Sequence, residues 1–404
     1  MTEALERPVV PPVSDADPFA ADVLLEPEPL HRTLREAGPV VRLSRYDVHA
    51  LARYEHVHAA LLDWQHFESG SGAGLANFRH EKPWRPPSLL LEADPPLHDA
   101  PCRVLREILA PPALHRLRAG WQAVAEEIVD QVLSQGSEFD AFPALAEAFP
   151  LQAFPDVVGL GPDGRENLLP YGNMVFNAFG PRNGLVTADA PRLAELSAWV
   201  NAQCRREALS EDGFGAQIWA AADRGDLTQE QAPLVVRSLL SAGFDTTVHG
   251  IAACLYALAT HPQEWQRLRK RPELARVAFE EAIRWQSPVQ TFFRTATTDV
   301  TVAGTLIPAH TKILMFLGAA NRDPARWPDP DRFDLTRDPS GHVGFGMGIH
   351  QCIGQHVARL EAETLLTALA RRVEHLELTG PPRRHPNNTL RSWTSLPMRV
   401  RPAA

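Results

Sequence analysis

Apolar residues recur at helical spacing through much of the chain, most clearly between about residue 100 and residue 290. The stretches LRAGWQAVAEEIVDQVLSQG and RPELARVAFEEAIRW show this period, and so does GQHVARLEAETLLTALARRV near the C-terminus. Residues 299–317 differ, because Gly-Thr and Pro-Ala turns separate their β-branched runs, which indicates strands. The pattern therefore predicts a mainly α fold with a smaller β portion.

One predicted helix is unusually long. Thr228 through Gln231 fits a capping box, and apolar positions then continue to about Thr260, where His261-Pro262 ends the run. A helix of roughly 30 residues would extend about 45 Å, which is enough to cross a whole domain.

The chain shows no internal repeat and no long linker, and the short stretch Ser69–Gly74 is typical of a loop. Although 404 residues would allow two or three domains, we expect one domain over residues 1–404, with residues 1–20 as a flexible N-terminal extension. That segment lacks the pattern of a signal peptide, and no stretch approaches the roughly 20 apolar residues that span a bilayer. We expect a cytoplasmic protein that does not bind membranes and keeps its thiols reduced.

Composition narrows the classes of function. Lys and Arg number 40 against 49 Asp and Glu, which gives a net charge of −9, and no basic run marks a nucleic-acid surface. The cysteines are widely spaced, at Cys102, Cys204, Cys254 and Cys352. They form no C-x-x-C pair, so neither a zinc ribbon, a disulfide framework nor a c-type haem attachment site is indicated.

Cys352 lies in the candidate loop Gly344–Gly354, whose glycines permit a tight turn with unusual backbone angles. A helix pattern begins directly behind the cysteine, and the N–H groups at that helix start would favour a thiolate. A single thiolate in such a loop is suited to binding haem iron axially. Taken alone, an isolated cysteine is more often a buried structural residue.

A second group of residues favours the haem-ligand interpretation of Cys352 over the structural one. Ala242–Thr247 places a glycine, an acid and two threonines inside the long apolar helix, where these residue types are poor choices. Threonine hydroxyls loosen a helix locally, and an acid beside an alcohol would relay protons. A third group is Glu281 with Arg284, which are three residues apart on a helix and can pair. Taken separately, Ala242–Thr247 is compatible with a tolerated kink, and Glu281 with Arg284 is compatible with an ordinary surface ion pair.

Together these residues resemble the cytochrome P-450 family of haem-thiolate monooxygenases. The motifs, in chain order, are DPPxH at Asp94–His98, AGxDTT at Ala242–Thr247, ExxR at Glu281–Arg284, PxRF at Pro330–Phe333 and FGxGxHxCxG at Phe345–Gly354. The resemblance implies the mostly helical, single-domain fold of that family, with haem b as cofactor and O2 as co-substrate.

The resemblance also implies roles for individual residues. Contacts to the cofactor would come from Cys352 as the proximal ligand of the iron, from Phe345 and Gly346 in its loop, and from His98, Arg294 and His350 at the haem propionates. Asp245 and Thr246 would guide protons to the bound oxygen. Glu281, Arg284 and Arg332 would form a buried network that stabilises the fold.

One position departs from the family pattern. Bacterial members commonly carry an arginine four residues after the DPPxH histidine, where this chain has Cys102. Two alternatives follow: the adjacent Arg103 takes over the propionate contact, or Cys102 is a surface thiol on the proximal side of the haem.

The long helix also carries candidate substrate contacts. Ser238, Ser241 and Asp245 are spaced i, i+3 and i+7, so they share one face, and Arg237 directly precedes them. An arginine with serine hydroxyls suits a carboxylate, and the about 12 Å between Ser238 and Thr246 would accommodate about one aromatic ring. The alternative that this spacing leaves open is an entry-channel arginine with helix-capping serines.

Four segments resemble the bacterial monooxygenases that oxidise para-substituted benzoates, typically by O-demethylation of 4-methoxybenzoate. They are WRPPS at 84–88, GRENLLPYGNMVFNAFGP at 164–181, VRSLLSAG at 236–243 and SPVQTFFR at 287–294. The resemblance implies that the carboxylate contacts Arg85, Ser88, Ser238 and Ser241 under a cap formed by Arg237, and that the ring lies among Phe176, Phe179, Ala242, Val289 and Phe292. We therefore expect oxygen insertion from O2 into the para substituent of an aromatic acid, by O-demethylation or by hydroxylation of a para-alkyl group.

Electrons must come from another protein, because the chain has no G-x-G-x-x-G after a strand and no flavin or nicotinamide region. The resemblance implies a small acidic ferredoxin with its reductase. We expect it to dock near Cys352 on basic residues such as Arg103, Arg106 or Arg359, and we expect this chain to be a monomer.

Two other functions stay open at this point. One is a peroxide-driven haem-thiolate enzyme, which the intact Asp245-Thr246 pair disfavours. The other is a non-enzymatic haem-thiolate gas sensor, which the Arg85 and Arg237 cluster disfavours because a sensor needs no organic-acid pocket.

Overall fold

Helices make up most of the structure, as the pattern of apolar positions predicts. The computed structural model describes residues 9–403. The α-helices are α1 (Ala21–Leu25), α2 (Glu28–Ala37), α3 (Tyr54–Leu62), α4 (Asp99–Ile108), α5 (Pro111–His115), α6 (Arg118–Gln135), α7 (Ala148–Val158), α8 (Leu168–Asn177), α9 (Gly184–Asp189), α10 (Leu193–Gln203), α11 (Phe214–Asp223), α12 (Gln231–Ala242), α13 (Asp245–Thr260), α14 (Pro262–Lys270), α15 (Ala275–Gln286), α16 (Leu317–Ala320) and α17 (Gln355–Arg372). Shorter helical segments are the π-helix η1 (Phe142–Glu147) and the 3₁₀ turns η2 (Arg165–Asn167), η3 (Ala190–Arg192), η4 (Arg206–Ala208), η5 (Pro272–Leu274) and η6 (Gly348–His350). The strands are β1 (Val13–Ser14), β2 (Val41–Leu43), β3 (Val48–Leu51), β4 (Phe67–Glu68), β5 (Glu138–Asp140), β6 (Thr291–Ala296), β7 (Val300–Val302), β8 (Thr305–Ile307), β9 (Lys312–Phe316), β10 (Val373–Leu378), β11 (Arg383–Pro386), β12 (Arg391–Ser395) and β13 (Pro397–Pro402).

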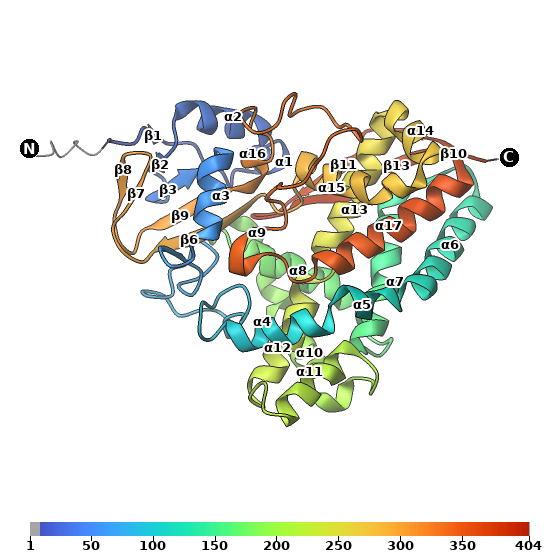
Figure 1. Ribbon diagram of the computed structural model, residues 1–404, viewed down its shortest axis with the longest axis horizontal. Helices are drawn as coiled ribbons and strands as arrows, with labels where there is room; N and C mark the ends of the chain where they lie inside the picture. The colour runs from blue at the N-terminus through green and yellow to red at the C-terminus, as the bar shows by residue number, and fades with distance from the viewer. Residues whose placement is uncertain (1–8, 404) are drawn as a thin grey trace, which may run out of the picture.

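The largest sheet lies at one end of the molecule, on the left in Figure 1. Its strand order is β1-β2-β3-β9-β6-β4, in which β3 and β9 are parallel while β6 and β9 are antiparallel. Leu34 of α2 packs with Leu43, Phe293 and Phe316 of this sheet in a small apolar core. The strands predicted within residues 299–317 are confirmed, because β7 and β8 pair with each other and β9 lies between β3 and β6.

The helical part of the molecule is built around α13, of which nearly every residue is buried. α15 packs against α13, and α17 packs against both α15 and α6. Figure 1 shows α6 and α17 running side by side on the right. No helix within residues 9–403 is long and apolar enough to cross a membrane.

The helix of about 30 residues that the sequence predicts is interrupted near its middle, so that prediction is wrong in this respect. α12 ends at Ala242 and α13 begins at Asp245, with Gly243 and Phe244 between them. The Thr246 hydroxyl donates to the Ala242 carbonyl over 3.1 Å, which is the local competition that loosens a helix. The interruption separates a helix that carries the candidate substrate contacts from one that forms the core.

Residues 9–20 are held to the fold by backbone hydrogen bonds and one buried side chain, so the prediction of a flexible extension over residues 1–20 is wrong for them. β1 pairs in parallel with β2, and the N–H of Val9 donates to the carbonyl of Gly304 over 2.8 Å. Phe19 is buried. The physical reason is that β2 would otherwise leave an open sheet edge, whose backbone groups β1 satisfies. Residues 1–8 lie outside the described part of the chain.

Glu281 and Arg284 form a fully buried ion pair, with 2.7 Å between Oε2 and Nε. Arg332, predicted as the third member of this network, is wrong, because its side chain is 61% exposed and faces Asp334 at 3.7 Å. Arg337 takes that place, since its Nε lies 3.1 Å from Glu281 Oε1. Arg332 contributes only its carbonyl oxygen, which accepts from Arg284.

Candidate active site

One large cavity, of about 230 Å³, is lined by parts of α8, α12, β6 and the loop that precedes α17. The lining brings together most of the predicted site residues, namely Arg85, Ser88, His98, Phe176, Phe179, Ser238, Ser241, Ala242, Thr246, Val289, Phe292, Arg294, Phe345, Gly346, His350 and Cys352. Two predicted residues, Arg237 and Asp245, do not contribute to this lining. Segments that are far apart in the sequence therefore meet at one cavity.

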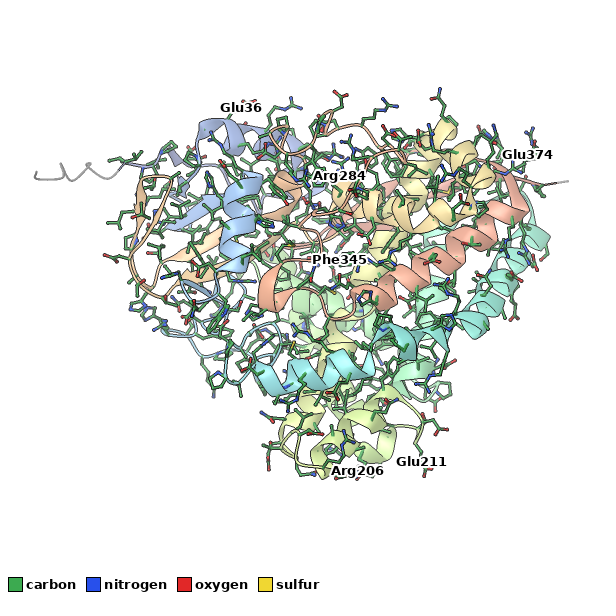
Figure 2. The ribbon with its side chains drawn as sticks, viewed as in Figure 1. Glu36, Arg206, Glu211, Arg284, Phe345 and Glu374 are labelled. Atoms are coloured by element: carbon green, nitrogen blue, oxygen red, sulfur yellow. The ribbon has the colours of Figure 1, made fainter. Side chains whose placement is uncertain are left out.

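The loop before α17 presents Cys352 to the cavity. The N–H of Cys352 donates to the Phe345 carbonyl over 2.8 Å, which closes the loop, and Figure 2 shows Phe345 near the middle of the molecule. Gly348 has a φ of 68°, and a Cβ on it would lie 2.7 Å from the Leu61 carbonyl oxygen. A glycine is required there because both the backbone angle and the close approach exclude a side chain.

The environment of the Cys352 thiol combines burial with favourable dipoles. Burial raises the pKa of this thiol above its ordinary value, while the N–H groups of Gly354 and Gln355 and the charge of Arg359 act in the opposite direction. The stabilisation of a thiolate by the helix start, as the sequence predicts, is thus present but smaller than the effect of burial. Because metal coordination removes a thiol proton outright, this sulfur is suited to binding a metal ion.

His98 and His350 lie together at the cavity, with 4.9 Å between their ring centroids. His350 Nε2 lies 2.9 Å from Asp94 Oδ1. Burial would raise the pKa of Asp94, but the hydrogen bonds from His350 and from the N–H of Gly70 lower it. Burial and the neighbouring His350 lower the pKa of His98 to about 4. Asp94 therefore fixes the orientation of one histidine, which in turn contacts the other.

Arg294 on β6 is fully buried beside these histidines on the cavity lining. Its Nη1 donates to the carbonyl of Phe293 over 2.9 Å, and no carboxylate within residues 9–403 forms an ion pair with it. Burial lowers the pKa of Arg294 to about 10. A guanidinium buried without a carboxylate favours an anionic group in the cavity.

The two alternatives for Cys102 and Arg103 are both wrong. Cys102 is buried on α4 and lines the cavity, so it is not a surface thiol. Arg103 is exposed and does not line the cavity. Burial raises the pKa of the Cys102 thiol, which keeps it protonated and apolar in character.

Aromatic side chains form one wall of the cavity. Phe179 contacts Phe176 and Phe292 edge to face, with centroid distances of 5.9 and 5.6 Å. Val289 and Ala242 extend the same lining. Aromatic edges and small aliphatic groups suit a flat apolar ring.

Arg85 brings a positive charge to this cavity. Its side chain is only 10% exposed, and its Nη1 is buried without a hydrogen-bond partner. The Ser238 hydroxyl donates to the Leu234 carbonyl over 3.1 Å, while the Ser88 oxygen accepts the N–H of Leu91 over 3.2 Å. An anion in the cavity would therefore find free donors on Arg85 and Ser88.

Arg237 supports this wall from behind. Its Nη2 donates to the carbonyls of Pro86 and Pro87 over 2.7 and 3.3 Å, so it holds the loop that carries Arg85. Burial and then the charge of Arg85 lower the pKa of Arg237. Arg237 therefore acts on the cavity wall through the loop that carries Arg85, and its role as a cap of the pocket stays a prediction.

Thr246 faces the cavity, whereas Asp245 points away from it toward α8. A Cβ on Gly172 of α8 would lie 1.4 Å from Asp245 Oδ2, so the carboxyl group occupies the space that this glycine leaves. Burial, followed by the charge of Glu147, raises the pKa of Asp245 well above its ordinary value. This environment favours the protonated form of Asp245, the residue that precedes Thr246 in the chain.

Arg359, expected on a docking surface, is held inside the protein. It pairs with Glu280, and its guanidinium carbon lies 4.8 Å from the ring centroid of Phe345. That part of the prediction is wrong, because the guanidinium is already neutralised and is only 14% exposed. Arg103 and Arg106 are exposed on α4.

Among the buried charged residues that were not predicted are Glu92 and Lys312. Glu92 Oε2 accepts the N–H of Ser88 over 2.9 Å and lies 3.9 Å from Arg85 Nη2. Lys312 Nζ donates to the Gly72 carbonyl over 2.6 Å, and burial lowers the pKa of Lys312 to about 7. The sequence signal that indicates their burial is a single charged residue next to an apolar run, which is LLLEA for Glu92 and KILMF for Lys312.

Comparison with known proteins decides the family. The model of the cytochrome P-450 family matches residues 211–402. The chain is 56% identical to Cytochrome p450 CYP199A2 of Rhodopseudomonas palustris over 96% of this chain and 94% of that protein. The chain belongs to the cytochrome P-450 family. It is also 30% identical to the beta-dihydromenaquinone-9 omega-hydroxylase of Mycobacterium tuberculosis, over 96% of this chain and 79% of that protein. Its structure resembles that of CYP108D1 from Novosphingobium aromaticivorans with a TM-score of 0.84 and 29% identity, covering 98% and 100% of the two chains.

Membership of the cytochrome P-450 family makes this chain a monooxygenase that uses haem b and O2, and it confirms the predicted single-domain fold. The cavity residues fit that cofactor. Cys352 supplies a sulfur at the cavity. Arg294 supplies a buried cation that has no carboxylate partner in the described part of the chain and would pair with a haem propionate. His98 and His350 lie beside that cation as further hydrogen-bonding groups.

Proposed function

We propose that this cytochrome P-450 oxidises the para substituent of a benzoate-type aromatic acid. The observation that carries the proposal is Arg85, whose Nη1 is buried, without a partner, on the lining of an aromatic cavity. An unpaired buried donor of this kind is unfavourable unless a ligand satisfies it. A substrate carboxylate would do so, with Ser88 and Ser238 beside it.

The remaining cavity residues would orient the ring. Phe176, Phe179 and Phe292 would enclose it, while Val289 and Ala242 limit its movement. Holding the acid at one end fixes which substituent faces the iron, so orientation rather than intrinsic reactivity would select the para position. Haem b supplies the oxygen activation and insertion chemistry when it is bound.

The overall reaction balances without any further co-substrate besides an electron donor. For 4-methoxybenzoate, one O2, two electrons and two protons would give 4-hydroxybenzoate, formaldehyde and one water. Thr246 would hold a proton donor at the cavity, and the protonated Asp245 behind it would supply that proton. Thr246→Ala should therefore release peroxide while still consuming electrons, and normal coupling in that variant would count against the relay.

We propose a small acidic ferredoxin as the electron donor. Arg103 and Arg106 on α4 provide exposed positive charge near the cavity end that Cys102 lines. Charge reversal at Arg103 should lower the rate of reduction most strongly at low ionic strength. An unchanged salt dependence would contradict this docking surface.

The test of the substrate is a titration of the ferric protein with 4-methoxybenzoate, followed by the Soret band. The neutral 4-methoxybenzamide is the matched control, because it keeps the ring and the methoxy group but not the charge. A shift from low to high spin with the acid, and a much weaker response to the amide, would support the proposal. A shift with neither compound would contradict it.

A further inference from the structure

The anion site contains a negative charge of its own. Glu92 is buried behind the loop that carries Arg85, and its Oε2 accepts the N–H of Ser88 over 2.9 Å. The same oxygen lies 3.9 Å from Arg85 Nη2. Glu92 thus occupies one nitrogen of the arginine and leaves Nη1, the nitrogen without a partner, for a ligand.

The buried charges on this wall sum to one positive charge. Arg85 and Arg237 contribute two cations and Glu92 one anion, and all three side chains are nearly excluded from water. Burial lowers the pKa of the nearby Lys312 to about 7, so this amine is largely neutral at pH 8, and Arg294 is assigned to a haem propionate. One singly charged acid would therefore neutralise the wall, whereas a doubly charged ligand would leave an uncompensated negative charge.

An uncompensated charge is expensive in such a site, because a low-dielectric environment screens it poorly. Arg237 is held at the loop, because its Nη2 donates to the carbonyls of Pro86 and Pro87. Glu92 therefore affects ligand selection through the charge balance as well as through the position of Arg85.

We propose that Glu92 is a specificity-determining residue that restricts the anion site to singly charged acids. The inference rests on the proposed function, because it concerns the same wall of the same cavity. It also explains why Glu92 lies beside the anion-binding Arg85. Without the charge of Glu92, the two cations Arg85 and Arg237 would favour phosphate-type dianions over carboxylates.

The experiment compares three ligands that differ in charge at one end of the same ring. Soret titrations of the haem-loaded protein would use 4-methoxybenzamide, 4-methoxybenzoate and 4-methoxyphenyl phosphate at pH 8, with charges of zero, minus one and minus two. Glu92→Gln removes the charge but keeps an acceptor for the N–H of Ser88. We expect the variant to gain affinity by about tenfold per unit of ligand charge relative to the amide.

A change in affinity that is the same for all three ligands would reflect a shift of Arg85 or of the packing. Only a change that grows with ligand charge reflects the charge of Glu92. Equal changes for all three ligands would overturn the inference, and so would a Glu92→Gln protein that still fails to bind the phosphate. The matched control is Glu264→Gln, since Glu264 is also buried, accepts the N–H of Leu335 and pairs with Arg267, but lies outside the cavity. It should show no dependence on ligand charge.

A second measurement needs no variant. The phosphate monoester loses its second proton near pH 6, so the wild-type protein should bind it about tenfold more weakly at pH 8 than at pH 5. The benzoate stays ionised over this range, so it reports the titration of protein groups, above all of Lys312, whose pKa burial lowers to about 7. Tighter binding of the dianion would overturn the inference. If 4-methoxybenzoate itself fails to bind the wild-type protein, the proposed function fails instead.

Discussion

At the scale of single residues, Gly172 determines where Asp245 places its carboxyl group. An alanine Cβ at this position would lie 1.4 Å from Oδ2 and 2.6 Å from Cγ, so Gly172→Ala must displace the acid. We expect about tenfold less product for each electron pair consumed, because proton delivery is lost, with the excess appearing as peroxide. The benzoate-induced Soret shift should be unchanged, because Asp245 does not line the cavity.

Gly120→Ala is the control for this substitution, because Gly120 lies within α6 and no atom lies within 4 Å of its added Cβ. Alanine should be neutral or slightly stabilising there. Product and peroxide are measured together with oxygen and electron consumption. A Gly172→Ala protein that folds with haem and couples like the wild type would show that the position of Asp245 does not matter.

Arg337 and Arg332 offer a second test at this scale. Arg337 contacts the fully buried Glu281 at 3.1 Å, whereas Arg332 faces Asp334 from an exposed position. Arg337→Gln should lower the free energy of unfolding by roughly 1–3 kcal/mol, because Glu281 keeps Arg284 but loses one charged donor. Arg332→Gln should cost less than about 1 kcal/mol, as surface pairs do. Urea unfolding of the haem-loaded proteins measures both, and a larger effect at Arg332 would contradict this assignment.

At the scale of elements, α12 begins with a reciprocal cap. The N–H of Gln231 donates to Thr228 Oγ1 over 3.2 Å, and the N–H of Thr228 donates to Gln231 Oε1 over 2.9 Å. Thr228→Ala should therefore lower the free energy of unfolding by about 1 kcal/mol. Thr187→Ala is the control, because that exposed hydroxyl only bonds back to Asn183 within its helix. Equal losses in the two variants would argue against a stabilising cap.

Elements with local signals were predictable, and those that depend on distant contacts were not. The cap at Thr228, the helix α17 and the strands β7 to β9 follow from spacing within short windows. The loosening at Ala242–Thr247 has a local signal in its threonines, but the full break between α12 and α13 was not predicted. The pairing of β1 depends on the free edge of β2, some 30 residues away, which no local pattern reveals.

The motifs predicted which residues lie near the site, but not where their side chains point. Motifs located Cys352 and Thr246, both of which reach the cavity. They did not show that Asp245 turns toward α8 or that Arg237 binds the loop backbone. Side-chain direction depends on neighbours from other segments, and so does the choice between Arg332 and Arg337.

At the scale of the whole molecule, a buried histidine links folding to pH. His249 in α13 is fully buried, and its Nδ1 accepts the N–H of Trp393 over 3.2 Å. Burial, followed by His385, lowers the pKa of His249 to about 3, against about 6.5 in an unfolded chain. Between these values the unfolded chain binds more protons, so the stability contributed by neutral His249 is complete above pH 6.5 and is lost as the pH falls toward 3.

His249→Gln keeps an acceptor but does not titrate. Acidification from pH 7.5 to 4.5 should therefore lower its free energy of unfolding by roughly 2–3 kcal/mol less than that of the wild type, as measured by urea unfolding. The exposed His80→Gln should behave like the wild type, and an equal acid sensitivity of His249→Gln would show that His249 does not carry this dependence.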